Sequence, residues 1–275
     1  MGEAKRKRST TAAFIEQFPN CYFCGGRRRA TTREHMPPKS LFDNSHRPDK
    51  LVMPACDECN GDTSTADLVA AVVSRWDYFS SQQENRDHRR LIPQIRIQAP
   101  DILKEWTEIT DPSDKDKARQ HLRNYGMLVP YDAGVATIGP LTIRQLNLFA
   151  HKAVLALHFE HFHRPLLMTG RICAYWKTKE DFANGGIPPQ LLAIMPKYGT
   201  LIQGKWDERQ TFEYRHDSSL EHGLFGCLAK LRRGLYVAGF TVTDANVIEP
   251  DDNVDWMRPD DSSVLLADER FSRKA

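Results

Sequence analysis

Two Cys-x-x-Cys pairs constrain this chain more than any other feature. Cys21 and Cys24 form the first pair, and Cys56 and Cys59 form the second, so that residues 25–55 separate them. A gap of two residues lets both sulfurs of a pair reach one ion from a tight turn, and Zn²⁺ binds four thiolates tetrahedrally. The four cysteines therefore predict a structural zinc site. The interval between the pairs must hold structure of its own, because it exceeds the roughly 15–20 residues of simple zinc ribbons.

The remaining cysteines and the hydropathy pattern indicate the compartment. Cys173 and Cys227 stand alone among apolar residues and are expected to be small core residues. No apolar run approaches the roughly 18 residues of a membrane helix, and the basic N-terminus lacks the apolar segment of a secretory signal. We therefore expect a cytoplasmic protein without membrane contact, in which paired cysteines bind metal rather than form disulfides.

Charge is unevenly distributed along the 275 residues, although the net charge is only +2. Residues 1–50 contain 11 Lys/Arg and 5 Asp/Glu (+6), whereas residues 241–275 contain 4 Lys/Arg and 9 Asp/Glu (−5). A basic N-terminal part suggests a polyanionic partner, and an acidic tail suggests a solvated end. Solvated surface at both ends is the simpler alternative.

Periodicity predicts an α+β fold with four parts. Short helices are expected at 12–18 and 68–79, the second capped by Thr63-Ser64-Thr65. Surface helices follow, including one at 114–126, then a hairpin at 127–139 and a long helix at 141–163 that begins at Pro140. Strands are expected at 171–178, 190–197, 211–217, 224–231 and 234–242. The parts are a zinc domain (1–80), a helical connector (81–125), an α+β domain (126–248) and an acidic, partly disordered tail (249–275).

The interval between the cysteine pairs carries residues that a structural zinc site does not need. Glu34-His35 lies in a strand-like stretch, Leu51–Ala55 is a short apolar strand leading into Cys56, and Asn60 follows Cys59 directly. Two strands followed by a helix that begins at the second cysteine pair make a ββα unit pinned by zinc. In such a unit Glu34, His35 and Asn60 can converge on one side.

Residues 18–70 resemble an HNH nuclease of the ββα-metal class, in the zinc-bearing, treble-clef-like form found in phage junction-resolving endonucleases. The resemblance is carried by C21-YF-C24, R33-E34-H35-M-P-P-K and V52-M-P-A-C56-DE-C59-N60. It implies a metal-dependent endonuclease in a bacterial or phage setting such as defence, recombination or mobile-element biology.

The resemblance also implies roles for individual residues. His35 would deprotonate a water, while Glu34 and Asn60 would hold a catalytic Mg²⁺ or Mn²⁺ at the scissile phosphate, in addition to the structural Zn²⁺. Neighbouring residues of a strand face opposite ways, so a shared site requires a bend at the strand end. The family's middle Asn should precede LVMPAC; here Asp49 occupies that place, with Asn44 earlier in the loop.

Basic residues surround the predicted site and favour nucleic acid as the partner. Phosphate contacts by Lys and Arg give affinity without sequence specificity. DNA is the expected partner, RNA is an alternative, and a homodimer or a partner protein is compatible with the sequence. The candidate contact residues are Arg27, Arg28, Arg29, Arg33 and Lys39.

Two rival interpretations are open to the same cysteines. A zinc deaminase needs His-x-Glu and Pro-Cys-x-x-Cys, but this chain has Glu34-His35, and Ala55 separates Pro54 from Cys56. A non-catalytic zinc module that binds nucleic acid or protein would need the cysteines and basic residues, but not Glu34, His35 and Asn60 together.

A second histidine-rich stretch lies at the end of the long helix. His158, Glu160, His161 and His163 could bind a metal, but charge at a helix C-terminus and solvated surface explain them more simply.

Overall fold

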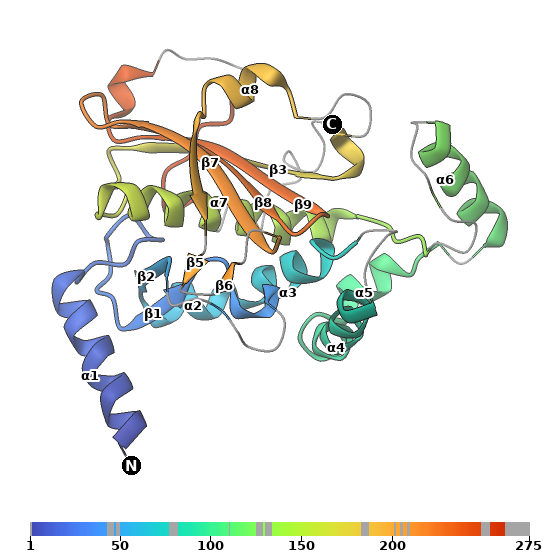
Figure 1. Ribbon diagram of the computed structural model, residues 1–275, viewed down its shortest axis with the longest axis horizontal. Coiled ribbons are helices and arrows are strands. Elements are labelled where there is room, and N and C mark those ends of the chain that lie inside the picture. Colours follow the sequence, from blue (N-terminus) through green and yellow to red (C-terminus); the bar gives the residue numbers. More distant parts are fainter. Residues whose placement is uncertain are drawn as a thin grey trace.

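A computed structural model shows a mixed α+β protein (Figure 1). Outside its description lie residue 1, 43–46, 48–49, 77–81, 110, 125–128, 130–133, 183–186, 201, 204–205, 208–209, 249–253 and 262–275. None of the helices in the described part combines the length and the apolar character needed to cross a membrane.

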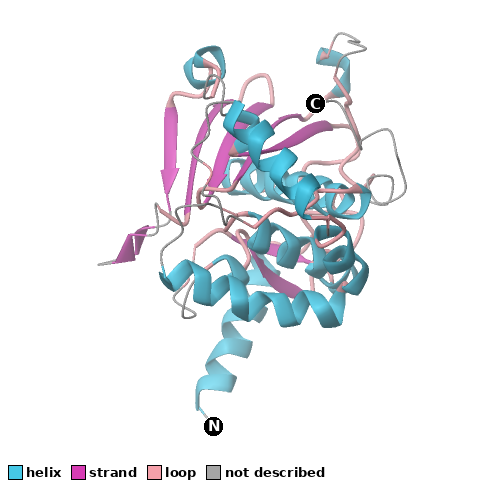
Figure 2. Ribbon diagram, turned by 90° about the vertical axis from the view of Figure 1, so that its right-hand side faces the viewer, coloured by secondary structure: helices cyan, strands magenta, loops and turns pink. Residues whose placement is uncertain are grey.

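The N-terminal region is a helix followed by a hairpin and two further helices. Its elements are α1 (Gly2–Gln17), β1 (Thr32–His35), η1 (Lys39–Leu41), β2 (Val52–Ala55), α2 (Asp57–Asp62) and α3 (Ser64–Val73). Strands β1 and β2 pair antiparallel, so the predicted ββα order is present. Helix α1 begins well before the predicted residue 12 and projects from the rest of the molecule (Figures 1 and 2).

In the described part of the chain three helices form the middle region, where the sequence predicts surface helices, one of them at 114–126. They are α4 (Gln82–Gln98), α5 (Pro100–Trp106) and α6 (Pro112–Asn124). The predicted hairpin that should follow is wrong in its second half, because residues 134–139 form no strand. The Glu105 carboxylate instead caps the next helix, accepting hydrogen bonds from the Leu141 and Thr142 backbone N–H groups at 2.9 and 3.0 Å.

The C-terminal region is an antiparallel sheet in the order β3-β9-β8-β7-β4. Its strands are β3 (Arg171–Thr178), β4 (Lys197–Thr200), β7 (Phe212–Ser219), β8 (Leu224–Leu231) and β9 (Leu235–Val242). The smaller elements are β5 (Ile202–Gln203), β6 (Trp206–Asp207), η3 (Glu180–Phe182), α8 (Pro189–Ala193) and η4 (Ala245–Val247). The strand predicted at 190–197 is wrong, because Pro189 sits in the first turn of α8.

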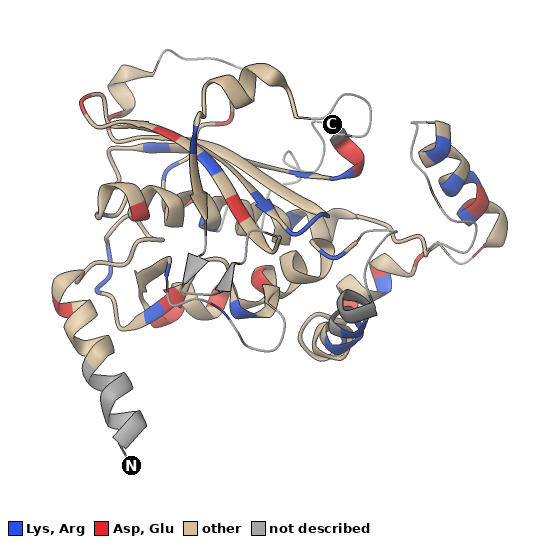
Figure 3. Ribbon diagram, in the orientation of Figure 1, with Lys and Arg blue, Asp and Glu red and all other residues tan. Residues whose placement is uncertain are grey.

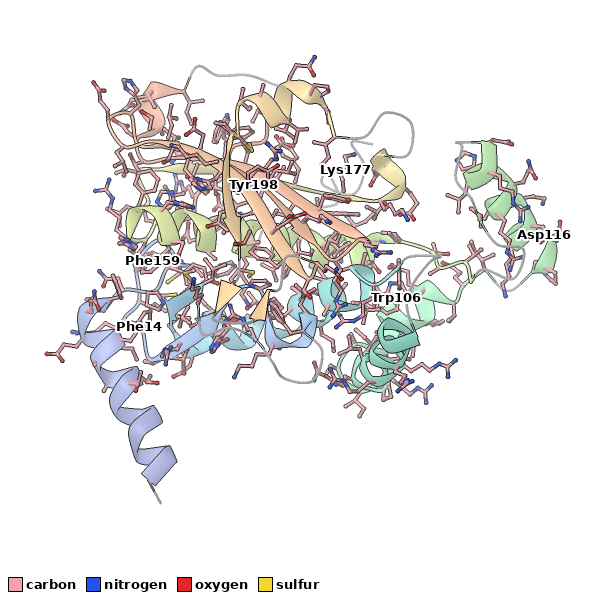
Figure 4. The ribbon with its side chains drawn as sticks, viewed as in Figure 1. Phe14, Trp106, Asp116, Phe159, Lys177 and Tyr198 are labelled. Atoms are coloured by element: carbon pink, nitrogen blue, oxygen red, sulfur yellow. The ribbon has the colours of Figure 1, made fainter. Side chains whose placement is uncertain are left out.

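Helix α7 (Pro140–Phe162) lies between the sheet and the N-terminal region (Figure 1). Every side chain from Leu148 to Phe159 is buried, which requires cover on opposite sides of the helix. The sheet provides one side and α3 the other. Phe18 joins the N-terminal region to α7. Its ring centre lies 5.2 Å from the ring centre of Phe14 and 5.2 Å from that of Phe159, which are both labelled in Figure 4.

The apolar core runs without interruption from the cysteines to the sheet, across the predicted boundary at residue 80. The β8–β9 turn strengthens this joint, since Gly234 N donates to Ser74 O at 3.0 Å and Arg232 Nε donates to Leu41 O at 2.9 Å. Residues 254–261 also pack on the body, with Met257 pairing in an isolated bridge with Ile172. The N-terminal and C-terminal regions therefore share one core.

Candidate functional site at the cysteine cluster

The four predicted cysteines meet at one point in the fold. Their Sγ atoms all lie within 4.8 Å of one another, and all four residues are buried. A tetrahedral Zn²⁺ with Zn–S bonds near 2.3 Å separates its sulfurs by about 3.8 Å. Hydrogen bonds between the thiols lower the pKa of Cys24 and raise the pKa of Cys21 and Cys59, as expected for sulfurs this close together. The donor set fits a structural zinc ion.

The first cysteine pair sits on a tight turn that two glycines close. Gly25 and Gly26 have φ of +63° and +76°, the left-handed region that favours glycine. Gly26 N donates to Cys21 O at 3.1 Å, and Cys21 N donates to Arg28 O at 2.9 Å. This turn presents both sulfurs inward.

The second pair belongs to the start of α2, with Cys56 as its N-cap residue. Thr63 was expected to cap α3, but its side chain does not do so. Its hydroxyl donates to Cys59 O at 2.9 Å. Thr63 therefore ties the end of α2 back to the cysteine turn.

Most of the predicted basic contact residues already have partners in the fold. Arg28 donates to Cys59 Sγ at 3.8 Å and pairs with Glu58 at 2.6 Å, so it serves the thiolate cluster. Arg27 pairs with Asp260 at 2.7 Å, and the Arg33 guanidinium lies 5.5 Å from the Phe14 ring centre. Charges of both signs occur in this part of the molecule: β1 carries Arg33 and Glu34, whereas α2 carries Asp57, Glu58 and Asp62 but neither Lys nor Arg (Figure 3).

Arg29 and Lys39 are the exposed candidates for which the structure records neither an ion pair nor a hydrogen bond among the described side chains. A nucleic-acid contact at this surface would therefore rest mainly on them.

The Glu34-His35 pair lies at the end of β1. The antiparallel ladder runs through both residues, with Glu34 opposite Met53 and His35 opposite Val52. Alternation along a strand places their side chains on opposite faces, and the expected bend between them is not visible in this pairing. Glu34 is buried and His35 is half-buried.

Asn60 does lie beside β1. Its Nδ2 donates to Thr32 Oγ1 at 3.2 Å, and Thr32 in turn donates to Ala55 O at 3.2 Å. Thr32 is two residues from Glu34, so both point to the same face of the strand. The structure therefore brings Asn60 and Glu34 to one face of the hairpin, with His35 directed to the other.

The Glu34 carboxylate contacts a lysine that the sequence interpretation missed. Lys152 Nζ, from α7, lies 3.1 Å from Glu34 Oε1 and 2.7 Å from Asp67 Oδ2 in α3. Burial alone would lower the pKa of Lys152, but the Asp67 and Glu34 carboxylates raise it, so the ammonium is retained. Burial raises the pKa of Asp67 to about 6.

A signal for this contact exists in the sequence. Lys152 carries the only Lys, Arg, Asp or Glu side chain between Arg144 and Glu160, and most of its neighbours from Leu148 to Phe159 are apolar. A single charge within an apolar stretch is expected to have a buried partner. The partner's identity has no local signal, because Glu34 lies 118 residues away.

Two candidates for the middle position of the motif, Asp49 and Asn44, lie outside the described residues.

The histidines at the end of α7 are less solvated than predicted. His158 is fully buried, and its Nδ1 lies 2.7 Å from Thr241 Oγ1 in β9. The His161 ring centre lies 4.0 Å from that of His216 in β7. Only His163, which ends the helix in a left-handed conformation, is exposed as expected.

The buried histidines predict a loss of stability in acid. Burial lowers the pKa of His158 to about 3, against 6.5 when unfolded. The unfolded chain therefore takes up a proton first, so that stability is intact above pH 6.5 and falls as the pH drops towards 3. In urea titrations, His158→Phe should flatten the fall between pH 6 and 4.5 by about 1.4 kcal/mol per pH unit. Zinc is lost in acid from the parent and the variant alike, so this loss cancels when their unfolding free energies are compared.

The exposed residue His222 provides the control for this measurement. His222→Ala should leave the pH dependence of the unfolding free energy as in the parent. An unchanged slope in His158→Phe would contradict the assignment of the acid sensitivity to this buried ring.

Comparison of the chain with protein-family models, curated proteins and solved structures finds no match in any of the three.

Proposed function

We propose that this protein is a zinc-stabilised endonuclease of the HNH type that hydrolyses phosphodiester bonds in DNA. The observation that supports this most directly is the hydrogen bond from Asn60 to Thr32. It sets the asparagine that follows the second cysteine pair beside β1, on the face of Glu34, while His35 lies on the other face of the same strand. A zinc site alone has no need of this contact.

His35 is the proposed general base. It is half-buried at the end of β1, and histidine suits general-base chemistry because its unperturbed pKa is about 6.5. The four thiolates join the Gly25-Gly26 turn to the end of β2 and the start of α2, so zinc would fix the strand that pairs with β1, which carries His35. Exposed Arg29 and Lys39 supply phosphate contacts.

Asn60 and Glu34 differ in their suitability as ligands of a catalytic cation. The Asn60 Nδ2 faces Thr32, which leaves its Oδ1 as an oxygen ligand of the kind Mg²⁺ prefers. The Glu34 carboxylate is buried against an ammonium and does not fit that role. Asn60 is therefore the proposed protein ligand of Mg²⁺ or Mn²⁺.

Plasmid nicking tests the proposal. Purified protein should convert supercoiled plasmid to open circles with Mg²⁺ or Mn²⁺ and lose this activity in chelator. His35→Ala should lower the rate by about 10²-fold or more, because a positioned general base contributes about 10²–10⁴-fold. His222→Ala removes an exposed imidazole and should nick like the parent, and zinc content measured by elemental analysis should be equal in all three proteins.

The non-catalytic zinc module is the second candidate function. The burial of Glu34 against Lys152 favours it, because an ion-paired acid has a structural role without any chemistry. If the protein bound DNA but did not cleave it with any metal, and if His35→Ala were indistinguishable from the parent, the zinc module would be supported and the nuclease rejected.

A further inference from the structure

Three charged groups are buried at the interface between the N-terminal region and α7. The exposed fractions of the Lys152, Glu34 and Asp67 side chains are 1%, 7% and 13%. They come from α7, β1 and α3 respectively. The ammonium lies within hydrogen-bonding distance of one oxygen of each carboxylate.

The other oxygens of this cluster have no hydrogen-bond donor among the described residues. Within the described part of the chain, Glu34 Oε2, Asp67 Oδ1 and Tyr22 Oη are buried without a hydrogen-bond partner. The charges of Glu34 and Asp67 both act on the Tyr22 hydroxyl, which belongs to the same buried surroundings. The cluster therefore carries two carboxylates and one ammonium in an enclosed space.

This arrangement suits an ammonium better than a divalent cation. Mg²⁺ keeps several waters and needs oxygens at about 2.0–2.1 Å in octahedral geometry. Each orphan oxygen here exposes less than 1 Å² to solvent, which leaves no route for a hydrated ion. The Lys152 charge would also repel a cation at Glu34 Oε1, 3.1 Å away.

We propose that Lys152 takes the place of a divalent cation at Glu34, so that Glu34 is a positioning residue rather than a metal ligand. The ion pair holds β1 against α7 and thereby fixes the strand end that carries His35. This inference rests on the proposed function for what His35 does, but the state of the Glu34 carboxylate can be measured without any activity.

The test measures the binding of Mn²⁺ to the full-length, zinc-loaded protein by titration calorimetry. Glu34→Gln should bind Mn²⁺ with an affinity within twofold of the parent. Lys152→Ala, which leaves two carboxylates and a space beside them, should gain a Mn²⁺ site that the Lys152→Ala/Glu34→Gln double variant lacks. Asp62→Asn, on the exposed surface of α2, controls for the loss of a nearby negative charge.

The outcomes separate the inference from the proposed function. A tenfold or greater loss of Mn²⁺ affinity in Glu34→Gln, or no new site in Lys152→Ala, would overturn the inference. If Lys152→Ala does not fold, the Glu34→Gln arm decides alone. Saturable Mn²⁺ binding unchanged by Glu34→Gln, together with a protein that never nicks DNA, would support the inference and reject the nuclease.

Where the protein nicks DNA, the kinetics give a second reading of the positioning role. Glu34→Gln should lower kcat while the Mn²⁺ concentration for half-maximal rate stays within twofold of the parent. A rise of tenfold or more in that concentration would overturn the inference.

Discussion

Cys59→Ser is expected to leave the protein without zinc and largely unfolded at 37 °C. The four sulfurs tie the Gly25-Gly26 turn to the start of α2, and all four cysteines belong to the core that continues into α7. Structural zinc contributes about 10–16 kcal/mol in small zinc-binding peptides at neutral pH, which equals or exceeds the whole stability of a typical domain. Elemental analysis and a circular-dichroism melt measure both effects.

Cys173→Ala is the matched control for that variant. Cys173 is buried in β3, and burial raises the pKa of its thiol to about 11, so that it is a neutral core residue. The control should keep its zinc and lose only about 1 kcal/mol, as expected for one small buried group. A Cys59→Ser protein that melted at the same temperature as Cys173→Ala would rule out a structural role for zinc.

Lys152→Met should lower the free energy of unfolding by about 3–5 kcal/mol, because it leaves the Glu34 and Asp67 carboxylates buried without their cation. Urea titration in saturating zinc measures the change. Replacing Glu34 by Gln and Asp67 by Asn in the same chain removes the uncompensated charges and should recover more than half of the loss.

A surface ion pair of similar length provides the comparison. Lys230 Nζ lies 2.9 Å from Glu213 Oε1, but their side chains are 34% and 31% exposed. Lys230→Met should change stability by no more than about 1 kcal/mol. Equal losses in Lys152→Met and Lys230→Met would show that burial of the Lys152 cluster has no energetic consequence.

Elements with a strong local pattern were predictable from the sequence. Strands β3 and β8 and helix α7 lie within a residue or two of their predicted bounds, because short apolar runs beside turn residues mark the strands, and a long apolar stretch that begins at Pro140 marks the helix. The cysteine cluster was also predictable, since spacing alone brings each pair to a turn. The segment 190–197 was misjudged because its short apolar run fits a strand and a helix equally well.

The surroundings of the acid-base pair could not be predicted in the same way. The partner of Glu34 comes from α7 and that of His158 from β9, 118 and 83 residues away. Such contacts depend on how a helix is covered on both sides, which a local pattern does not encode. The resemblance indicated which residues to examine, but the environment of Glu34 came only from the structure.

The shared core has a consequence for protein engineering. A fragment cut at residue 80 would retain the zinc ligands and His35, but would expose the apolar side of α3 and leave Glu34 and Asp67 without Lys152. Grafting this segment onto another protein would therefore require a substitute for α7 with a lysine at the position of Lys152, within reach of Glu34 and Asp67. The hairpin and its helix depend on packing against α7, so they cannot be transferred to another protein on their own.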